Sequence, residues 1–138
     1  MFIFISSLFI SCGNRKETDR KITDIIREIK TRYVPDSRVA IFSISMRRNK
    51  DQVLLFGDVD NPDIKQELLT SVSKITNGII DSIRILPETS LAGQTWGLVR
   101  ISVANMRRSP AHSAELVSQA LMGTELKIWK RQKEWYLV

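Results

Sequence analysis

The stretch Lys127–Val138 reads KIWKRQKEWYLV and places two strand patterns on either side of a charged turn. Apolar and aromatic residues fill both ends of the stretch, and Arg131-Gln-Lys-Glu134 separates them. β-Branched and aromatic runs around a polar turn are typical of a β-hairpin. The strand pattern continues to the last residue, so the sequence predicts that Val138 lies within a sheet.

The region before this hairpin also contains short strand patterns and no helical spacing. Trp96–Ala104 reads WGLVRISVA, and Glu125–Lys130 reads ELKIWK. Short strands without helices between them predict an all-β domain over residues 96–138. Glu88–Thr95, which reads ETSLAGQT, has the composition of a linker.

Residues 103–138 resemble a bacterial SH3 (SH3b) domain. The resemblance rests on the pattern V-x-N-x-R-x-x-P, a loop, G-x-x-L/V-x-V, and a charged turn before W-Y-x-V. These positions are Val103, Asn105, Arg107, Pro110, Gly123, Leu126, Ile128, Trp135, Tyr136 and Val138. No closing segment of the SH3b type follows, so the resemblance implies an incomplete, truncated SH3b barrel and a chain that is a fragment of a longer product.

The longer string SVANMRRSPAHSAELVSQALMG is similar to SH3b domains that precede an NlpC/P60 cysteine peptidase domain. Such envelope enzymes cut peptidoglycan stem peptides between γ-D-glutamate and a diamino acid. The resemblance implies that Glu115, in a loop facing the cleft, binds the free amine of the peptide, since a carboxylate suits an ammonium. An exposed loop charge is the alternative for Glu115. Asn105 and Arg107 are expected to hold the loop by hydrogen bonds to backbone.

Residues 18–87 predict the element order α-β-β-α-β, an α+β arrangement with two helices on one face of a three-stranded sheet. The first helix is capped by Thr18 or Asp19, after a short polar tether over Gly13–Glu17. Two strands, Arg38–Met46 and Gln52–Phe56, form a hairpin that stops at Gly57. The apolar stripe of the first helix consists of Ile22, Ile25, Ile26, Ile29 and Tyr33.

The second helix is expected to begin with Asn61 as its cap and Pro62 at its first position. Asn77–Gly78 is expected to end it in the left-handed conformation, and Ile79–Leu86 is the third strand. This order resembles a BON-like domain of bacterial envelope proteins. Such domains are generally taken to bind membranes or envelope polymers without catalysis.

The first ten residues, MFIFISSLFI, are almost wholly apolar, and the only cysteine, Cys12, follows them. About ten residues are too few to cross a bilayer core, but they suit the apolar region of a secretory signal. The stretch Phe9–Cys12 resembles a bacterial lipoprotein signal, which implies a signal peptide over residues 1–12, lipidation of Cys12, and a lipid-anchored protein exported to the cell envelope. A buried N-terminal element with an inert thiol is the alternative.

The single cysteine and single histidine exclude an internal disulfide and a cysteine/histidine zinc cluster. Cysteine peptidases need a thiolate activated by a histidine, and no pattern links Cys12 to His112. We therefore expect no catalytic residue, metal site or cofactor in this chain. The net charge of +6 favours acidic partners without choosing among them.

The resemblances together imply a non-catalytic peptidoglycan-binding or targeting region of a membrane-anchored murein hydrolase of the NlpC/P60 type, present as a fragment. The expected partners are stem peptides or another cell-wall polymer, and a membrane through the lipid anchor. A stand-alone SH3b-containing envelope lipoprotein is the alternative. A nucleic-acid-binding protein is the third choice, because basic and aromatic residues lie together near Val138, but charged hairpin turns are usually solvated and no nucleic acid is expected.

Overall fold

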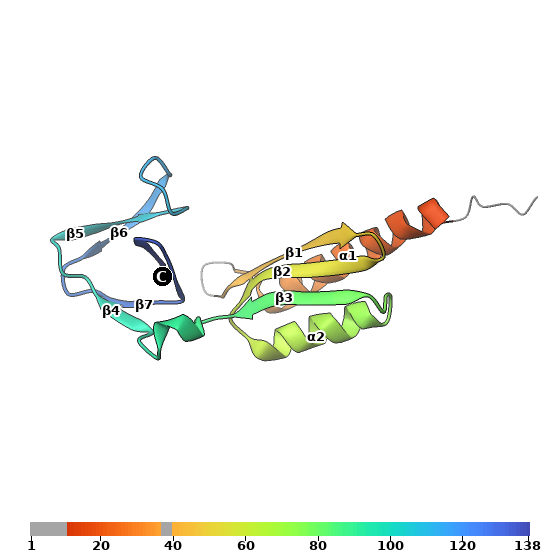
Figure 1. The fold of residues 1–138 in the computed structure, drawn as a ribbon. Coiled ribbons are helices and arrows are strands. Elements are labelled where there is room, and N and C mark those ends of the chain that lie inside the picture. The colour runs from red at the N-terminus through yellow and green to blue at the C-terminus, as the bar shows by residue number, and fades with distance from the viewer. Residues whose placement is uncertain (1–10, 37–39) are drawn as a thin grey trace, which may run out of the picture. The chain divides into compact units, whose positions relative to one another are not determined.

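The computed structural model describes residues 11–36 and 40–138 of the chain. They divide between Ile85 and Leu86 into two compact units. We call the first the α+β unit and the second, Leu86–Val138, the β unit (Figure 1).

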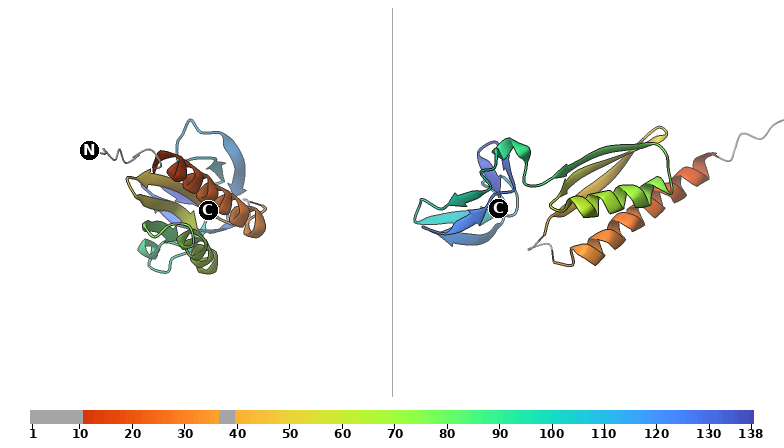
Figure 2. Two further views of the ribbon diagram at one scale, coloured as in Figure 1. Left: turned by 90° about the vertical axis from the view of Figure 1, so that its right-hand side faces the viewer. Right: turned by 90° about the horizontal axis from the view of Figure 1, so that it is seen from below.

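The α+β unit has the predicted order α-β-β-α-β. Its strands form one sheet in the order β1-β2-β3, with β1 antiparallel and β3 parallel to β2. Both helices cover the same face of this sheet (Figure 2). The elements are α1 (Ser11–Tyr33), β1 (Phe42–Asn49), β2 (Gln52–Val59), α2 (Pro62–Ser73) and β3 (Ile79–Ile85).

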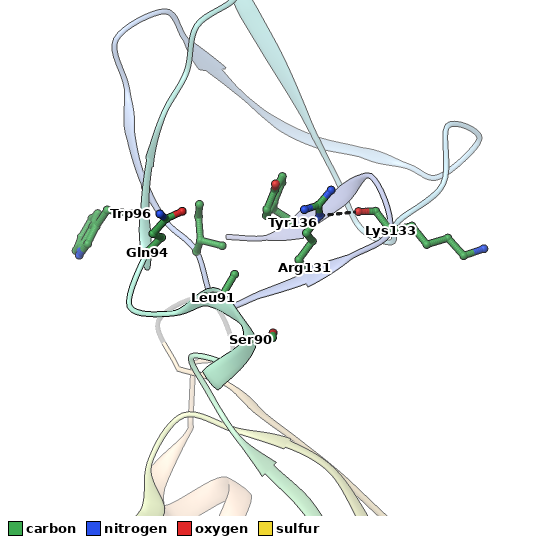
Figure 3. Close-up of a pocket in the computed structure, with 8 residues that line it drawn as sticks. Ser90, Leu91, Gln94, Trp96, Arg131, Lys133 and Tyr136 are labelled. Carbon is green, nitrogen blue, oxygen red and sulfur yellow. Dashed lines mark hydrogen bonds between the residues drawn. The ribbon is translucent and has the colours of Figure 1, made fainter.

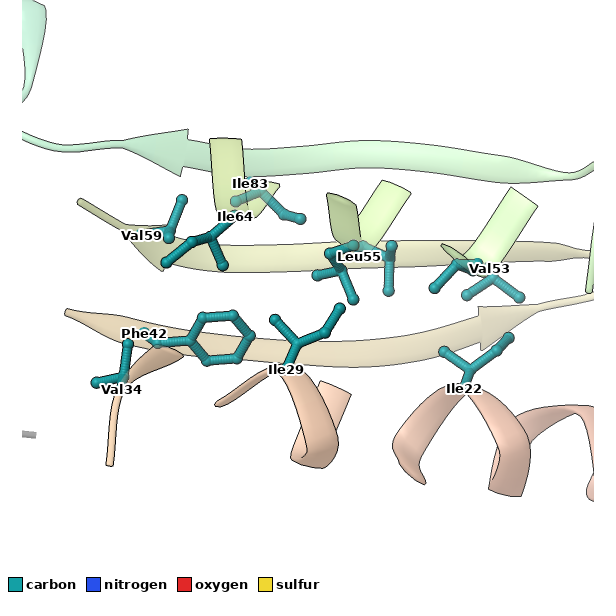
Figure 4. Packing of buried hydrophobic residues seen from close by; sticks show 11 residues of the cluster. Ile22, Ile29, Val34, Phe42, Val53, Leu55, Val59, Ile64 and Ile83 are labelled. Atoms are coloured by element: carbon teal, nitrogen blue, oxygen red, sulfur yellow. The ribbon is translucent and has the colours of Figure 1, made fainter. Parts of the chain in front are cut away.

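The core of the α+β unit lies between the helices and the sheet, and every element contributes to it (Figure 4). Its largest fully buried side chains are Ile22, Leu55, Leu68, Val53, Val59 and Val72. Burying one such side chain contributes about 1.5–3 kcal/mol. The apolar side chains that recur at helical spacing on α1 and α2 therefore pack against the alternating apolar side chains of β2 in a single layer.

The start of α2 is as predicted, but its end is not. The Asn61 side chain accepts a hydrogen bond of 2.8 Å from the Asp63 N–H, and Pro62 opens the helix. The helix ends at Ser73, and its C-cap Lys74 keeps a right-handed helical conformation. The expected left-handed end at Asn77–Gly78 is therefore wrong.

The first helix begins earlier than the sequence predicts. α1 starts at Ser11, so the stretch Gly13–Glu17 is helical and is not a tether, and neither Thr18 nor Asp19 caps the helix. The stretch contains no proline, and a Glu17–Lys21 ion pair of 2.8 Å supports the first turns of the helix. The BON-like assignment of this unit stays a prediction.

The hairpin of β1 and β2 is longer than predicted, because β2 does not stop at Gly57. Gly57 lies inside the strand with φ of 131°, and it pairs with Ile44 of β1. A Cβ atom at this position would lie 1.9 Å from the Ser43 carbonyl oxygen. Only glycine fits this close approach of two strands. The predicted first residue of the hairpin, Arg38, lies outside the described residues.

The outer edge of β3 is closed by polar side chains. Asp81 accepts a hydrogen bond of 2.9 Å from the Ile83 N–H, and the Lys65 ammonium of α2 donates one of 2.7 Å to the Ile83 carbonyl. Lys65 and Asp81 also form an ion pair of 2.8 Å. Occupied backbone groups make this part of the edge a poor template for another strand.

The β unit is built from three antiparallel two-stranded ladders, β4–β7, β5–β6 and β8–β9. β6 lies where the sequence predicts no strand, and the expected strands Trp96–Ala104 and Glu125–Lys130 are each interrupted. The elements are η1 (Thr89–Leu91), β4 (Trp96–Leu98), β5 (Val103–Arg107), β6 (Leu116–Leu121), β7 (Glu125–Lys127), β8 (Lys130–Gln132) and β9 (Trp135–Leu137). The structure confirms the α+β class with a β region, and an incomplete barrel stays a prediction.

Candidate ligand pocket of the β unit

A pocket of about 570 Å³ opens on the β unit (Figure 3). Its lining comes from the turn before β4, from β4 itself, and from β8, β9 and the residues around them. The lining residues are Ser90, Leu91, Gln94, Trp96, Ile128, Arg131, Lys133 and Tyr136. All of them belong to the β unit, so this unit forms the pocket by itself.

Backbone hydrogen bonds bring these distant segments together. The Glu88 N–H donates to the Trp129 carbonyl at 2.8 Å, and the Ile128 N–H donates to the Thr95 carbonyl at 2.7 Å. The Trp129 N–H then donates to the Leu137 carbonyl at 2.8 Å. The stretch Glu88–Thr95, which composition assigns to a linker, is thus fixed to the β unit and supplies one wall of the pocket.

The opposite wall carries an arginine held over an aromatic ring. The Arg131 guanidinium carbon lies 5.8 Å from the centre of the Tyr136 ring, and its Nε donates to the Lys133 carbonyl at 3.0 Å. A cation over an aromatic face is attracted by the ring. These two contacts orient the guanidinium, and among the described residues its terminal nitrogens have no hydrogen-bond or ion-pair partner.

The pocket has an aromatic rim. Tyr136 is 49% exposed and Trp96 is 64% exposed, although aromatic rings are costly to leave in water. Figure 3 shows the Trp96 ring on the outer side of its strand, away from Arg131 and Tyr136. Tyr136 is therefore the aromatic group for a ligand inside the pocket, and Trp96 can contact only its outer part.

The charged residues of the lining are Arg131 and Lys133, and Figure 3 shows the Lys133 side chain extending away from the other lining residues. Arg131 is therefore the charged group for a ligand, and an arginine can bind a carboxylate through two parallel hydrogen bonds. The pocket is therefore suited to a ligand that carries a carboxylate and an apolar or planar part.

The predicted site residue Glu115 does not line this pocket. It precedes β6, and its carboxylate accepts a hydrogen bond of 2.7 Å from Arg108 Nε. This hydrogen bond and the charge of Arg108 lower the pKa of Glu115. An ammonium ligand at Glu115 would have to displace Arg108.

The two other residues expected to hold this loop behave differently. Arg107 Nη1 donates to the Ala114 carbonyl at 2.6 Å, which confirms its expected bond to backbone. Asn105 instead accepts a hydrogen bond of 2.9 Å from the Gln119 side chain of the paired strand β6. His112 lies in the same loop, with its ring centre 5.1 Å from a ring centre of Trp135.

The N-terminal predictions fall mostly outside the described residues. Cys12 is in the first turn of α1, and residues 1–10 are not described, so the signal peptide and the lipidation of Cys12 stay predictions. Over residues 11–36 and 40–138, no helix has the length and apolarity to cross a membrane. The same residues hold no group of three or more His, Cys, Asp or Glu side chains placed to bind a metal.

Sequence reasoning missed the pocket although it identified part of its lining. Arg131 and Lys133 were expected to be solvated turn charges, and Ser90, Leu91 and Gln94 lay in the expected linker. The available signal was the alternation of cationic and aromatic residues in KIWKRQKEWYLV. The residues across the pocket, Ser90, Leu91 and Gln94, are about forty positions earlier in the sequence and show no local pattern that predicts this proximity.

The fold and the pocket define the β unit as a small β module with an open pocket on its surface. Residues 106–138 match the family model of the bacterial dipeptidyl-peptidase Sh3 domain, and this segment of the chain is a bacterial SH3 domain. It contributes Ile128, Arg131, Lys133 and Tyr136 to the pocket. An SH3 domain is a binding module, and no catalytic domain is found with it. No curated protein and no solved structure matches the chain.

Proposed function

We propose that this chain is the non-catalytic, cell-wall-binding region of a membrane-anchored murein hydrolase of the NlpC/P60 type. The observation that carries the proposal is the bacterial SH3 domain at residues 106–138, because bacterial SH3 domains commonly bind cell-wall polymers. The pocket that this segment helps to form offers a surface for such a ligand.

The ligand is a peptidoglycan stem peptide bound through a free carboxylate. Stem peptides carry carboxylates, and Arg131 presents a guanidinium that its contacts with Tyr136 and Lys133 have already oriented. An oriented donor loses less conformational entropy on binding than a free one. The Tyr136 ring packs against the apolar part of the peptide.

The peptidase parent is supported by the resemblance of residues 102–123 to SH3b domains of NlpC/P60 enzymes. The matched family model is likewise named for a bacterial dipeptidyl-peptidase. In the full gene product we expect a downstream Asp-Cys-Ser-Gly segment and a later histidine. A stop codon directly after Val138 in verified genomic sequence would instead favour the stand-alone envelope lipoprotein.

The binding proposal is tested by sedimenting the purified chain with peptidoglycan sacculi. Arg131→Gln is compared with Arg100→Gln, which removes the same charge from an exposed residue that does not line the pocket. Because charged hydrogen bonds contribute about 1.5–3 kcal/mol, Arg131→Gln should weaken binding by roughly tenfold or more. The tryptophan emission spectrum shows whether each variant keeps the fold of the β unit.

Two results would overturn this proposal. In one, the unsubstituted chain does not sediment with sacculi. In the other, Arg131→Gln and Arg100→Gln bind sacculi equally well. Retention of the chain on immobilised DNA, with none on sacculi, would favour the nucleic-acid function instead.

A further inference from the structure

Strand β6 forms an edge of the β unit that has exposed apolar side chains and no charge. It pairs with β5 alone, in a two-stranded ladder (Figure 1). Four apolar residues of this stretch are exposed, namely Leu116, Val117, Leu121 and Met122, the last of which directly follows the strand. Among the described strands of more than three residues, β6 is the one without a charged side chain. An edge strand of this composition is suited to pairing with another strand.

The edge strands of the α+β unit are protected against such pairing. At β3, the side chains of Lys65 and Asp81 occupy the backbone carbonyl and N–H of Ile83. At β1, the strand itself carries Arg47 and Arg48. Charged side chains on an edge strand oppose pairing with further strands. β6 has no such protection.

The backbone of β6 leaves hydrogen-bonding groups for a second strand. The Met122 N–H donates to the Ser102 carbonyl at 3.1 Å, and hydrogen-bonded pairs alternate with non-hydrogen-bonded pairs along an antiparallel ladder. The backbone groups of Ala120 therefore point to β5, whereas those of Gln119 and Leu121 point away from it. The Leu121 carbonyl accepts a bond within the turn after β6. Among the described residues, both backbone groups of Gln119 and the N–H of Leu121 remain for a partner strand.

We infer that β6 pairs antiparallel with β6 of a second copy of the chain, around a two-fold axis at Gln119. Only registers that place outward-pointing residues opposite one another satisfy the backbone groups. The register centred on Gln119 also sets Val117 opposite Leu121 of the second copy, and it does so twice. The register centred on Ala120 would set Gln119 opposite Leu121 and leave the exposed Val117 opposite a glycine.

A second copy suits this edge because the strand is complementary to itself. In the register centred on Gln119, Leu116 also lies opposite Met122, so that all four exposed apolar side chains meet one another across the axis. Apolar pairs directly opposite each other stabilise an antiparallel sheet. An uncharged strand sets no like charges opposite each other when it pairs with itself, and it offers no ion pair to a charged partner. Dimers with two-fold symmetry form through one such self-complementary surface.

The register is tested by disulfide crosslinking of the full chain. The substitution Gln119→Cys, made together with Cys12→Ser so that the chain has a single thiol, should crosslink two copies upon oxidation with diamide. The two Cα atoms would lie about 5.5 Å apart, which a disulfide can span.

The matched control is Asn105→Cys, again with Cys12→Ser. Asn105 is the partner of Gln119 in β5, and either substitution removes the same side-chain hydrogen bond between them. The two copies of Asn105 would be three strand spacings apart, about 14 Å. This distance is beyond the reach of a disulfide, so the control should stay uncrosslinked.

The contribution of the apolar contacts is tested by sedimentation equilibrium over a range of chain concentrations. Leu121→Lys removes both contacts with Val117 and puts two charges into the interface. It should raise the dissociation constant of the dimer by roughly tenfold or more. Leu98→Lys is the control, because Leu98 is 60% exposed and Leu121 is 64% exposed, and Leu98 belongs to β4. It should leave the dissociation constant unchanged, and the tryptophan emission spectrum shows whether each variant keeps its fold.

Three outcomes would overturn the inference. They are an unsubstituted chain that stays monomeric at every concentration, equal crosslinking of Gln119→Cys and Asn105→Cys, and equal dissociation constants for the two lysine variants. β6 contributes no lining residue to the pocket, so a failure to bind sacculi leaves the inference standing.

Discussion

Both units contain paired strands, but the α+β unit and the β unit differ in how much of their apolar surface is covered. In the α+β unit, eleven buried hydrophobic side chains form one cluster. In the β unit, the buried hydrophobic residues are Leu86, Val99 and Ala120. Strand pairing alone therefore does not produce a core, which here requires helices packed across a sheet.

The exposed apolar side chains show the same difference. Among the described residues, Tyr33, Ile80 and Ile85 are the large hydrophobic residues exposed in the α+β unit. The β unit exposes eleven, and Trp96, Leu98, Ile101, Leu121 and Met122 are each at least 60% exposed. Isolated two-stranded ladders are marginal in water. We conclude that the α+β unit supplies most of the stability, whereas the β unit leaves much of its apolar surface exposed.

Each unit has its own spectroscopic signal. All three tryptophans, Trp96, Trp129 and Trp135, are in the β unit. Both α-helices, α1 and α2, are in the α+β unit. Urea unfolding of the full chain can therefore be followed by tryptophan fluorescence for one unit and by circular dichroism at the helical band for the other.

The largest effect is expected from truncating the core of the α+β unit. Leu68 is fully buried, so Leu68→Ala should lower the free energy of unfolding by about 2–5 kcal/mol. The loss should appear in the helical signal as a lower urea midpoint. Leu121→Ala is the matched control in the β unit, since Leu121 is 64% exposed. Comparable losses for the two leucines would contradict the comparison of the units.

A second effect should distinguish two glycines that both have positive φ. At Gly57 a Cβ would meet the Ser43 carbonyl of the neighbouring strand, whereas at Gly123 nothing lies within 4 Å. Gly57→Ala adds overpacking to backbone strain and should cost about 2–4 kcal/mol in the helical signal. Gly123→Ala should cost only about 1 kcal/mol in the fluorescence signal. The prediction fails if Gly57→Ala is the milder change.

The smallest effect is expected at the exposed Glu115–Arg108 ion pair. Its contribution is present above the unfolded pKa of Glu115, near 4.5, and is lost as pH falls through the lowered folded pKa. Glu115→Gln should therefore leave the fluorescence midpoint at neutral pH almost unchanged, because exposed pairs are screened by water. Any small advantage of the unsubstituted chain should be lost as the pH falls below 4.5.

The same variant sharpens the assignment of the binding site. If the pocket binds the ligand through Arg131, Glu115→Gln should bind sacculi as the unsubstituted chain does. If Glu115→Gln lost sacculus binding and Arg131→Gln did not, the binding site would be in the loop before β6 and not in the pocket.

The sequence predicts the α+β unit well because its signals are local. The stripe Ile64, Leu68 and Val72 and the cap at Asn61 follow from spacing and backbone chemistry over a few residues. The early start of α1 was missed because Gly13 and Asn14 are poor helix formers, whereas contacts such as the Glu17–Lys21 ion pair support the helix there. The continuation of β2 through Gly57 was missed because it depends on Ser43 in the neighbouring strand.

The candidate site was less predictable for a physical reason. Its walls meet only through pairings between remote segments, such as Glu88 with Trp129 and Thr95 with Ile128. No periodicity within either segment encodes these pairings. The SH3b pattern includes Ile128 and Tyr136 but does not predict that they line a pocket, and the contribution of Ser90, Leu91 and Gln94 is seen only in the structure.

Native-state hydrogen exchange of the full chain, followed residue by residue, tests the division between the units most directly. We expect slow exchange for the amides of β2 and α2, which lie in the packed unit, and much faster exchange for the amides from Trp96 to Leu137. Uniformly slow exchange across both units in the monomeric chain would contradict it, because the β unit would then be as firmly packed as the α+β unit.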